Sequence, residues 1–392
     1  MPVSRAQFAE EVDDCAGCLD SYGKLETAMR RSFHPDPRVA AEVLAAEAYL
    51  QDLRLPLTGT SLGPNRHGNP CPHWGLVILF LEKAKERLFE DRHAVRDLVQ
   101  MAVEISENLG GDSYSEMLVW DLRARVLGEL ANAYRLLDNG TKSDSCFATA
   151  FEYYSKGSRS ARLWLRLQSL LAGSHSSRGS FYQALLILDQ ATKLAAHGPQ
   201  EEILLELFWQ QAQVHYKAGR TQDALRDIET AIASLPEESS KRIRFALLFH
   251  RILYLLDLGF TSEARQQLLV LPPAPPSLRV ESRHLWTEGR LLRAEGRPSW
   301  AIPPLEKSIE TFKGEGDLYR AALAMVDLSA VYLELGRIEE AERLAASVHP
   351  LFLARKASTE VLMVARLLGE AANSETLSVP MLDEVARYLQ RI

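Results

Sequence analysis

The sequence has few of the features that mark a secreted or membrane-spanning protein. Its 392 residues include four cysteines: Cys15, Cys18, Cys71 and Cys146. So few cysteines in a chain of this length do not form a disulfide framework. The longest apolar run, Trp74–Leu81, is far shorter than the roughly 20 residues that span a bilayer. Because the first ten residues also lack the apolar core of a signal peptide, we expect a cytoplasmic protein with no membrane partner.

The chain also lacks an excess of basic residues. It has 45 Lys and Arg against 52 Asp and Glu, which gives a formal net charge of -7. Nucleic-acid binders normally present a basic face that displaces phosphate counterions, so direct binding of nucleic acid is not expected. The 46% hydrophobic and 25% charged composition is that of an ordinary folded protein.

No catalytic motif is found in the context that its chemistry needs. The string Gly59-Thr60-Ser61-Leu62-Gly63 matches the nucleophile elbow of hydrolases, in which the serine lies on a strained turn between a strand and a helix. Here Pro64 follows at once, and no βαβ units are predicted. Metalloprotease, phosphate-loop and dinucleotide motifs are missing. We therefore expect a non-enzymatic protein without a cofactor, and a hydrolase that uses Ser61 is the disfavoured alternative.

One set of residues has the composition of a zinc site. Cys15 and Cys18 form a C-x-x-C pair, and Cys71 and His73 add a thiol and an imidazole. The pair falls inside an apparent helix, however, and Cys71 is more than fifty residues away with no second tight pair. Reduced or buried cysteines are therefore the preferred interpretation, and these four residues remain a weak zinc candidate.

The second half of the chain contains a repeat of about forty residues. It is clearest in the segment Phe208–Pro236, where Ala212 precedes Tyr216 by four residues and shares a helix face with it. Gly219 then ends the first helix, because glycine adopts the left-handed cap conformation at no steric cost. Ala224 follows in the second helix, where a small side chain lets two antiparallel helices approach closely.

The same spacing of glycine and alanine occurs five times. The pairs are Gly179 and Ala184, Gly219 and Ala224, Gly259 and Ala264, Gly296 and Ala301, and Gly336 and Ala341. Successive alanines are 40, 40, 37 and 40 residues apart. Five occurrences in near register predict a repeat architecture.

These small, aromatic, glycine and alanine positions resemble the tetratricopeptide repeat family, most clearly from about Leu165 to Pro350. The resemblance implies an all-α fold: a right-handed superhelical array of about six or seven helical hairpins, with repeats longer than the family's usual 34 residues. More loosely, the chain from Trp74 onwards resembles bacterial regulatory proteins of this family.

Three parts are predicted along the chain. Residues 1–73 form an N-terminal helical element that ends in a Pro- and Gly-rich linker, Leu55–His73. Residues 74–350 form the repeat array, beginning with a hairpin of Trp74–Phe89 and Ala94–Leu109. Residues 351–392 supply capping helices, Leu351–Ala372 and Met381–Leu389, which cover the last apolar face of the array.

In this family the first helix of each repeat lines a concave groove. Carried over residue by residue, the resemblance implies these groove residues: Arg166, Trp209, Gln213, Tyr216, Lys217, Phe249, Arg283, Trp286, Arg290 and Arg293. Tryptophan, tyrosine and arginine are the side chains enriched at binding hot spots. Trp209 and Trp286 stand where the first lysine of the family's carboxylate clamp would be, so that mode of binding is in doubt. The alternative is that the tryptophans are core residues and the arginines are solvated.

The predicted function is an adaptor or regulatory scaffold that binds a protein or peptide partner in the groove. The alternative is a transcription-control protein, in which residues 1–73 bind a sigma factor or another regulator while the repeats act as a sensor. The sequence leaves open whether the N-terminal element or the concave groove is the main binding surface, and whether the array self-associates.

Overall fold

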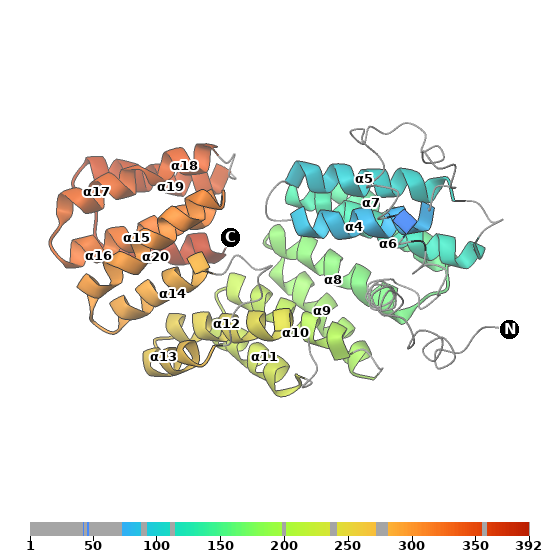
Figure 1. The fold of residues 1–392 in the computed structure, drawn as a ribbon, viewed down its shortest axis with the longest axis horizontal. Coiled ribbons are helices and arrows are strands. Elements are labelled where there is room, and N and C mark those ends of the chain that lie inside the picture. The colour runs from blue at the N-terminus through green and yellow to red at the C-terminus, as the bar shows by residue number, and fades with distance from the viewer. Residues whose placement is uncertain are drawn as a thin grey trace, which may run out of the picture. The chain divides into compact units, whose positions relative to one another are not determined.

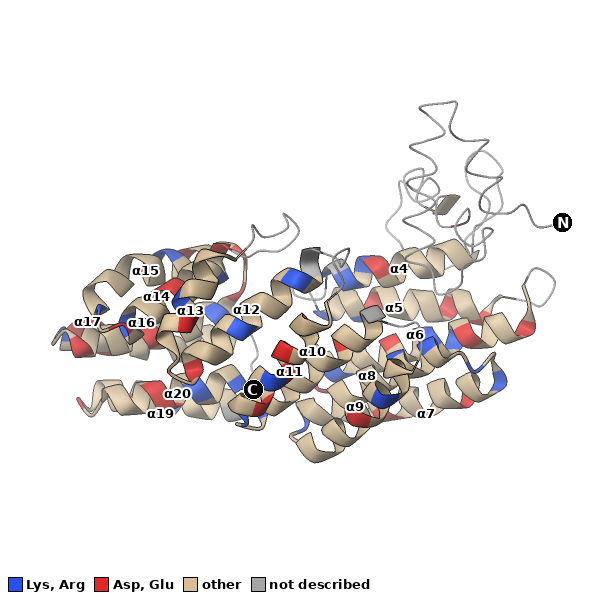
Figure 2. Ribbon diagram, turned by 90° about the horizontal axis from the view of Figure 1, so that it is seen from below, with Lys and Arg blue, Asp and Glu red and all other residues tan. Residues whose placement is uncertain are grey.

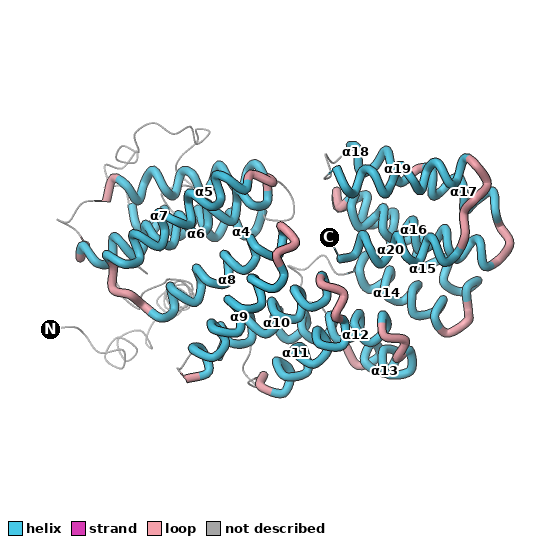
Figure 3. The backbone as a smooth tube through the Cα atoms, turned by 180° about the vertical axis from the view of Figure 1, so that it is seen from behind, coloured by secondary structure: helices cyan, strands magenta, loops and turns pink. Residues whose placement is uncertain are grey.

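The computed structural model describes residues 42, 45–46, 73–87, 92–109, 114–197, 201–235, 241–271, 281–354 and 359–391. Every regular element in these ranges is a helix (Figures 1 and 3). This confirms the predicted all-α array of helical hairpins. None of the described helices is long and apolar enough to cross a membrane. The chain divides into two compact units, Met1–Ser174 and His175–Ile392, and the boundary falls within a helix, α8.

The first unit consists of hairpins around its own apolar core. Its helices are α4 (His73–Arg87), α5 (Arg92–Glu107), α6 (Glu116–Leu136), α7 (Gly140–Lys156) and most of α8 (Ala161–Ser177). Helix α4 packs on α5, α5 on α6 and α6 on α7. Trp74 and Phe80 are buried in the core of α4 to α6. The predicted first hairpin is confirmed with ends that differ by one or two residues.

The second unit continues the pairing of helices. Its remaining helices are α9 (Phe181–Ala196), α10 (Glu201–Lys217), α11 (Thr221–Ala233), α12 (Lys241–Asp257), α13 (Thr261–Leu269), α14 (Glu281–Ala294), α15 (Pro298–Gly314), α16 (Leu318–Glu334), α17 (Ile338–Ala346), α18 (Val348–Ala354), α19 (Thr359–Asn373) and α20 (Val379–Arg391). The helices α10, α12, α14 and α16 are the first helices of four successive hairpins, and each packs on the helix that follows it.

The glycines and alanines of the repeat have the structural roles that the sequence predicts. The five glycines have φ between 71° and 81°, a region that side chains with a Cβ avoid. At Gly219 the cap is a Schellman motif: the Arg220 N–H donates to the His215 carbonyl at 2.8 Å, and the Gly219 N–H to the Tyr216 carbonyl at 2.9 Å. The five partner alanines are 0% exposed, and the two helices of the hairpin pack on each other at α10–α11, α12–α13, α14–α15 and α16–α17.

The last helices pack on the end of the array and turn back on it. Helix α19 packs on α17 and α18, and the predicted capping role of residues 351–392 stays a prediction. Helix α20 instead returns along α16 and reaches α10, the first helix of a hairpin far upstream. The C-terminal end of the chain therefore meets the surface formed by the first helices of the second unit.

Several expectations concern residues outside the described ranges. They include the N-terminal element and its linker, the elbow-like Ser61 and three of the zinc candidates, Cys15, Cys18 and Cys71. The division at residues 73 and 350 stays a prediction. Figure 2 shows acidic and basic residues interspersed along the helices of both units.

Candidate functional site

The first helices of the second unit bring side chains from four hairpins into contact. Trp209 on α10 meets His250 on α12, with ring centroids 5.5 Å apart. Tyr216 on α10 stacks on Tyr254 of α12 at 5.0 Å. Because the four helices are equivalent in successive repeats, their side chains form one continuous row. We call this row the first-helix surface.

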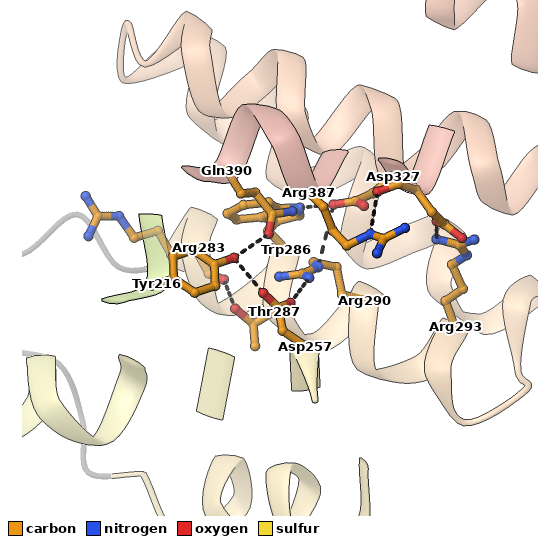
Figure 4. Close-up of polar contacts among 11 residues, drawn as sticks. Tyr216, Asp257, Arg283, Trp286, Thr287, Arg290, Arg293, Asp327, Arg387 and Gln390 are labelled. Atoms are coloured by element: carbon orange, nitrogen blue, oxygen red, sulfur yellow. Dashed lines mark hydrogen bonds and ion pairs between the residues drawn. The ribbon is translucent and has the colours of Figure 1, made fainter. Parts of the chain in front are cut away.

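The best-connected part of this surface is a hydrogen-bonded cluster, which we call the aspartate network: Tyr216, Asp257, Trp286, Arg290 and Asp327 (Figure 4). The Tyr216 hydroxyl donates to Asp257 Oδ2 at 2.5 Å, and Arg290 Nη2 donates to Asp257 Oδ1 at 2.6 Å. Trp286 Nε1 donates to Asp327 Oδ2 at 2.6 Å. Arg290 Nε lies 3.8 Å from the same oxygen of Asp327. The network thus joins helices α10, α12, α14 and α16.

The electrostatics of the network follow from burial and pairing. Burial alone would lower the pKa of Arg290, but the carboxylates of Asp257 and Asp327 more than offset it, so the net shift is upward. Burial raises the pKa of Asp327 despite the nearby Arg290. Burial and the adjacent Asp257 carboxylate raise the pKa of the Tyr216 hydroxyl, which therefore remains a hydrogen-bond donor at neutral pH. These groups are hydrogen-bonded or ion-paired with one another, so we assign the network a structural role.

Helix α20 supplies the partners for the C-terminal end of the first-helix surface. Arg293 on α14 donates from Nη1 to Asp383 Oδ1 at 2.7 Å and from Nε to Glu334 Oε1 at 2.9 Å. The Tyr216 hydroxyl is 3.2 Å from Gln390 Oε1. The Tyr319 hydroxyl donates to the Leu389 carbonyl at 2.6 Å. Residues of α16 and α20 therefore satisfy Arg293 and Tyr216, while Arg391 Nε, beside the Tyr216 ring, is buried without a hydrogen-bond partner among the described residues.

Arg283 is in a different situation. It lies in the first turn of α14, and its guanidinium points away from the aspartate network (Figure 4). Among the described residues it has no hydrogen bond or ion pair from the guanidinium. Burial, and then the nearby Arg320, lower the pKa of Arg283 to about 10, although Asp317 and Glu315 oppose this shift.

The other predicted groove residues are dispersed. Phe249 is 5% exposed and stacks on Phe245 in a small apolar cluster. Trp286 is 7% exposed and belongs to the core of α14 to α20. Gln213 and Lys217 are half-buried on α10. Arg166 belongs to the first unit, where it donates from Nη2 to Glu129 Oε1 at 2.8 Å.

No group of His, Cys, Asp and Glu that could hold a metal ion is found in the part of the chain that the structure describes. His73 begins α4, but its three zinc-candidate partners lie outside that part. Cys146 is a free thiol, and burial raises its pKa.

Three members of the site are not among the residues predicted from the sequence. Asp327 follows an apolar run in α16, and a single buried acid in such a run is a recognisable signal. His250 stands next to the predicted Phe249 and is the residue that meets Trp209. Asp383 could not be found, because its role depends on the return of α20 to a helix 90 residues earlier in the chain.

Comparison with known proteins identifies the fold alone. No protein-family model matches the chain, and no curated protein matches it. Among solved structures, it is similar to a Rap protein complexed with competence and sporulation factor, with a TM-score of 0.56 and 15% identity over 80% of this chain and 88% of that one. It is also similar to the Rap conjugation gene regulator of the plasmid pLS20 in complex with the Phr* peptide, with a TM-score of 0.52 and 11% identity over 98% and 96% of the two chains.

Proposed function

We propose that the protein is a regulatory, non-catalytic scaffold that binds a peptide, or a segment of a protein partner, on the first-helix surface of its second unit. One observation carries the proposal. Four consecutive hairpins place aromatic and charged side chains in one row, and some polar groups of that row have no hydrogen-bond partner among the described residues. Trp209 Nε1 is buried and has no hydrogen-bond acceptor among the residues that the structure describes. A buried donor without an acceptor costs about 1–3 kcal/mol unless a ligand supplies one.

The similar structures support a peptide as the ligand. Both Rap structures were solved in complex with a named factor or peptide, and the fold of this chain matches them over most of its length. Because the identities are 15% and 11%, the choice of ligand does not carry over to this chain.

The proposal can be tested with a display library of short random peptides selected against the full chain. A selected peptide, labelled with a fluorophore, is then titrated with wild-type protein and with variants, and its anisotropy gives the dissociation constant. Trp209→Ala removes a large aromatic side chain from the surface, and we expect binding at least about tenfold weaker, as for a hot-spot residue. Gln213→Ala on the same helix is a milder second variant that leaves the aromatic packing intact.

Trp300→Ala is the matched control. Trp300 is 66% exposed on α15, the second helix of its hairpin, and it contacts Arg297 rather than the first-helix surface. This variant should bind like the wild type. The proposal is refuted if no selected peptide binds the full chain, or if binding survives both Trp209→Ala and Gln213→Ala while circular dichroism shows them folded.

A further inference from the structure

The polar side chains at the two ends of the first-helix surface differ in how completely they are hydrogen-bonded or ion-paired. At the C-terminal end, Arg290 and Arg293 are paired with Asp257, Glu334 and Asp383. A second group consists of Trp209 and His250, near the middle of α10 and α12, and of Arg283 and Arg320, in the first turns of α14 and α16. We call this group the Arg283 cluster. Trp209 and His250 are in ring contact, and Arg283 and Arg320 both act electrostatically on His250. Trp209 Nε1 has no hydrogen-bond partner among the described residues.

Contacts and charges define the Arg283 cluster. The rings of Trp209 and His250 are in edge-to-face contact, 5.5 Å between centroids. His250 donates from Nδ1 to the Ala246 carbonyl at 2.8 Å, so its ring is fixed in place. Burial and then the nearby Arg283 and Arg320 lower the pKa of His250 to about 4, with the Ala246 carbonyl opposing the shift. Both arginines therefore act electrostatically on the His250 ring, which is neutral at neutral pH.

The acidic residues nearby are engaged elsewhere. Asp317 pairs with Arg320 and caps α16 by accepting from the Arg320 backbone N–H at 3.2 Å. Glu315 accepts from the Ser282 hydroxyl at 2.9 Å. Arg283 is left largely buried, with a cationic neighbour and with no carboxylate of the described residues in hydrogen-bond contact. A charged guanidinium in this state is costly to keep, and a ligand anion would relieve the cost.

We propose that the Arg283 cluster is a carboxylate site, in which the guanidinium of Arg283 and the indole Nε1–H of Trp209 receive a carboxylate group of the bound segment. Arg320 contributes a second positive charge, and the neutral His250 ring lies against the Trp209 indole. The inference rests on the proposed function, because it names the chemistry that the first-helix surface recognises. The carboxylate comes either from an Asp or Glu side chain or from a free C-terminus.

The indole of Trp209 offers a direct readout. The full chain, labelled with ¹⁵N at its six tryptophan indoles, is observed by NMR, and the Trp209 signal is assigned by its loss in Trp209→Phe. Three capped tripeptides are the probes: acetyl-Gly-Glu-Gly-amide, acetyl-Gly-Gly-Gly with a free C-terminus, and the neutral acetyl-Gly-Gln-Gly-amide. We expect at least one carboxylate probe to shift the Trp209 indole signal saturably, since its N–H gains an acceptor, and the neutral probe not to shift it. Which carboxylate probe binds more tightly identifies the source.

Arg283→Gln removes the charge and keeps much of the side-chain volume. It should weaken binding of the active probe by about tenfold or more, as expected for the loss of a charge-assisted hydrogen bond. Arg343→Gln removes one charge from an exposed position on α17 and should leave binding unchanged. Circular dichroism establishes that both variants are folded.

The outcomes separate this inference from the proposed function. If a selected library peptide binds but neither carboxylate probe moves the Trp209 signal, the carboxylate site is wrong and the scaffold function stands. If a carboxylate probe moves the signal but no library peptide binds, the site stands and the scaffold function fails. An equal shift with the neutral probe, or undiminished binding by Arg283→Gln, overturns the carboxylate site.

Discussion

At the scale of single residues, the repeat depends on two small side chains with different tasks. Gly219 accepts a left-handed backbone at the end of α10, and Ala224 allows α11 to lie close to its neighbours. The sequence predicts both roles because each is local and steric. A residue such as Arg283 is different: its position on α14 could be predicted, but its lack of an ion pair depends on side chains from other helices.

Ala224→Leu tests the close helix contact. Ala224 is fully buried on α11, and forcing three more carbon atoms into the contact should destabilise the protein by about 1–3 kcal/mol. Ala233→Leu on the exposed side of the same helix is the control and should change stability by less than about 0.5 kcal/mol. Urea denaturation followed by circular dichroism measures both. Equal stability of the two variants would mean that Ala224 is not at a tight crossing.

His250 should make stability depend on pH. Its folded-state pKa of about 4 lies below the roughly 6.5 of an unfolded chain, so between these values the unfolded state binds more protons. Stability is therefore lost as the pH falls through this window. From pH 8 to pH 5 the wild type should lose about 2 kcal/mol more than His250→Asn. Urea denaturation at both pH values measures the difference, and identical losses in the two proteins would contradict the assignment.

At the scale of helices, the aspartate network links α10, α12, α14 and α16 through buried polar bonds. Asp257 accepts from both Tyr216 and Arg290, and it is 7% exposed. Removing one member of a buried charged pair leaves the other uncompensated, which costs far more than breaking a surface pair. We therefore attribute the relative positions of these four helices to the network as well as to their apolar contacts.

Asp257→Asn separates these contributions. The amide removes the charge that compensates Arg290, and we expect a loss of about 2–4 kcal/mol. Glu229→Gln makes the same chemical change in the exposed Arg251–Glu229 pair and should cost less than about 1 kcal/mol. Thermal and urea denaturation of both variants provide the comparison. If Asp257→Asn were as mild as Glu229→Gln, the network would not stabilise the helix array.

At the scale of the whole molecule, the sequence predicts the fold better than the site. The hairpins could be predicted because glycine caps and buried alanines recur at a fixed period. The partners of Tyr216 and Arg293 could not, since Gln390 and Asp383 come from α20, 174 and 90 residues away along the chain. Nothing in the local pattern of Val379–Arg391 indicates that this helix returns to α10 and α16. Local steric rules thus reveal the repeats, and long-range pairing determines which groups remain available for a ligand.

Hydrogen–deuterium exchange of the full chain, with and without a saturating selected peptide, locates the surface that the peptide covers. We expect slower exchange of amides in α10, α12 and α14, around Trp209, His250 and Arg283. We expect unchanged exchange in α4 to α7 of the first unit and around Arg343 on α17. Protection confined to α4 to α7, or equal protection of Arg343 and Arg283, would contradict binding on the first-helix surface.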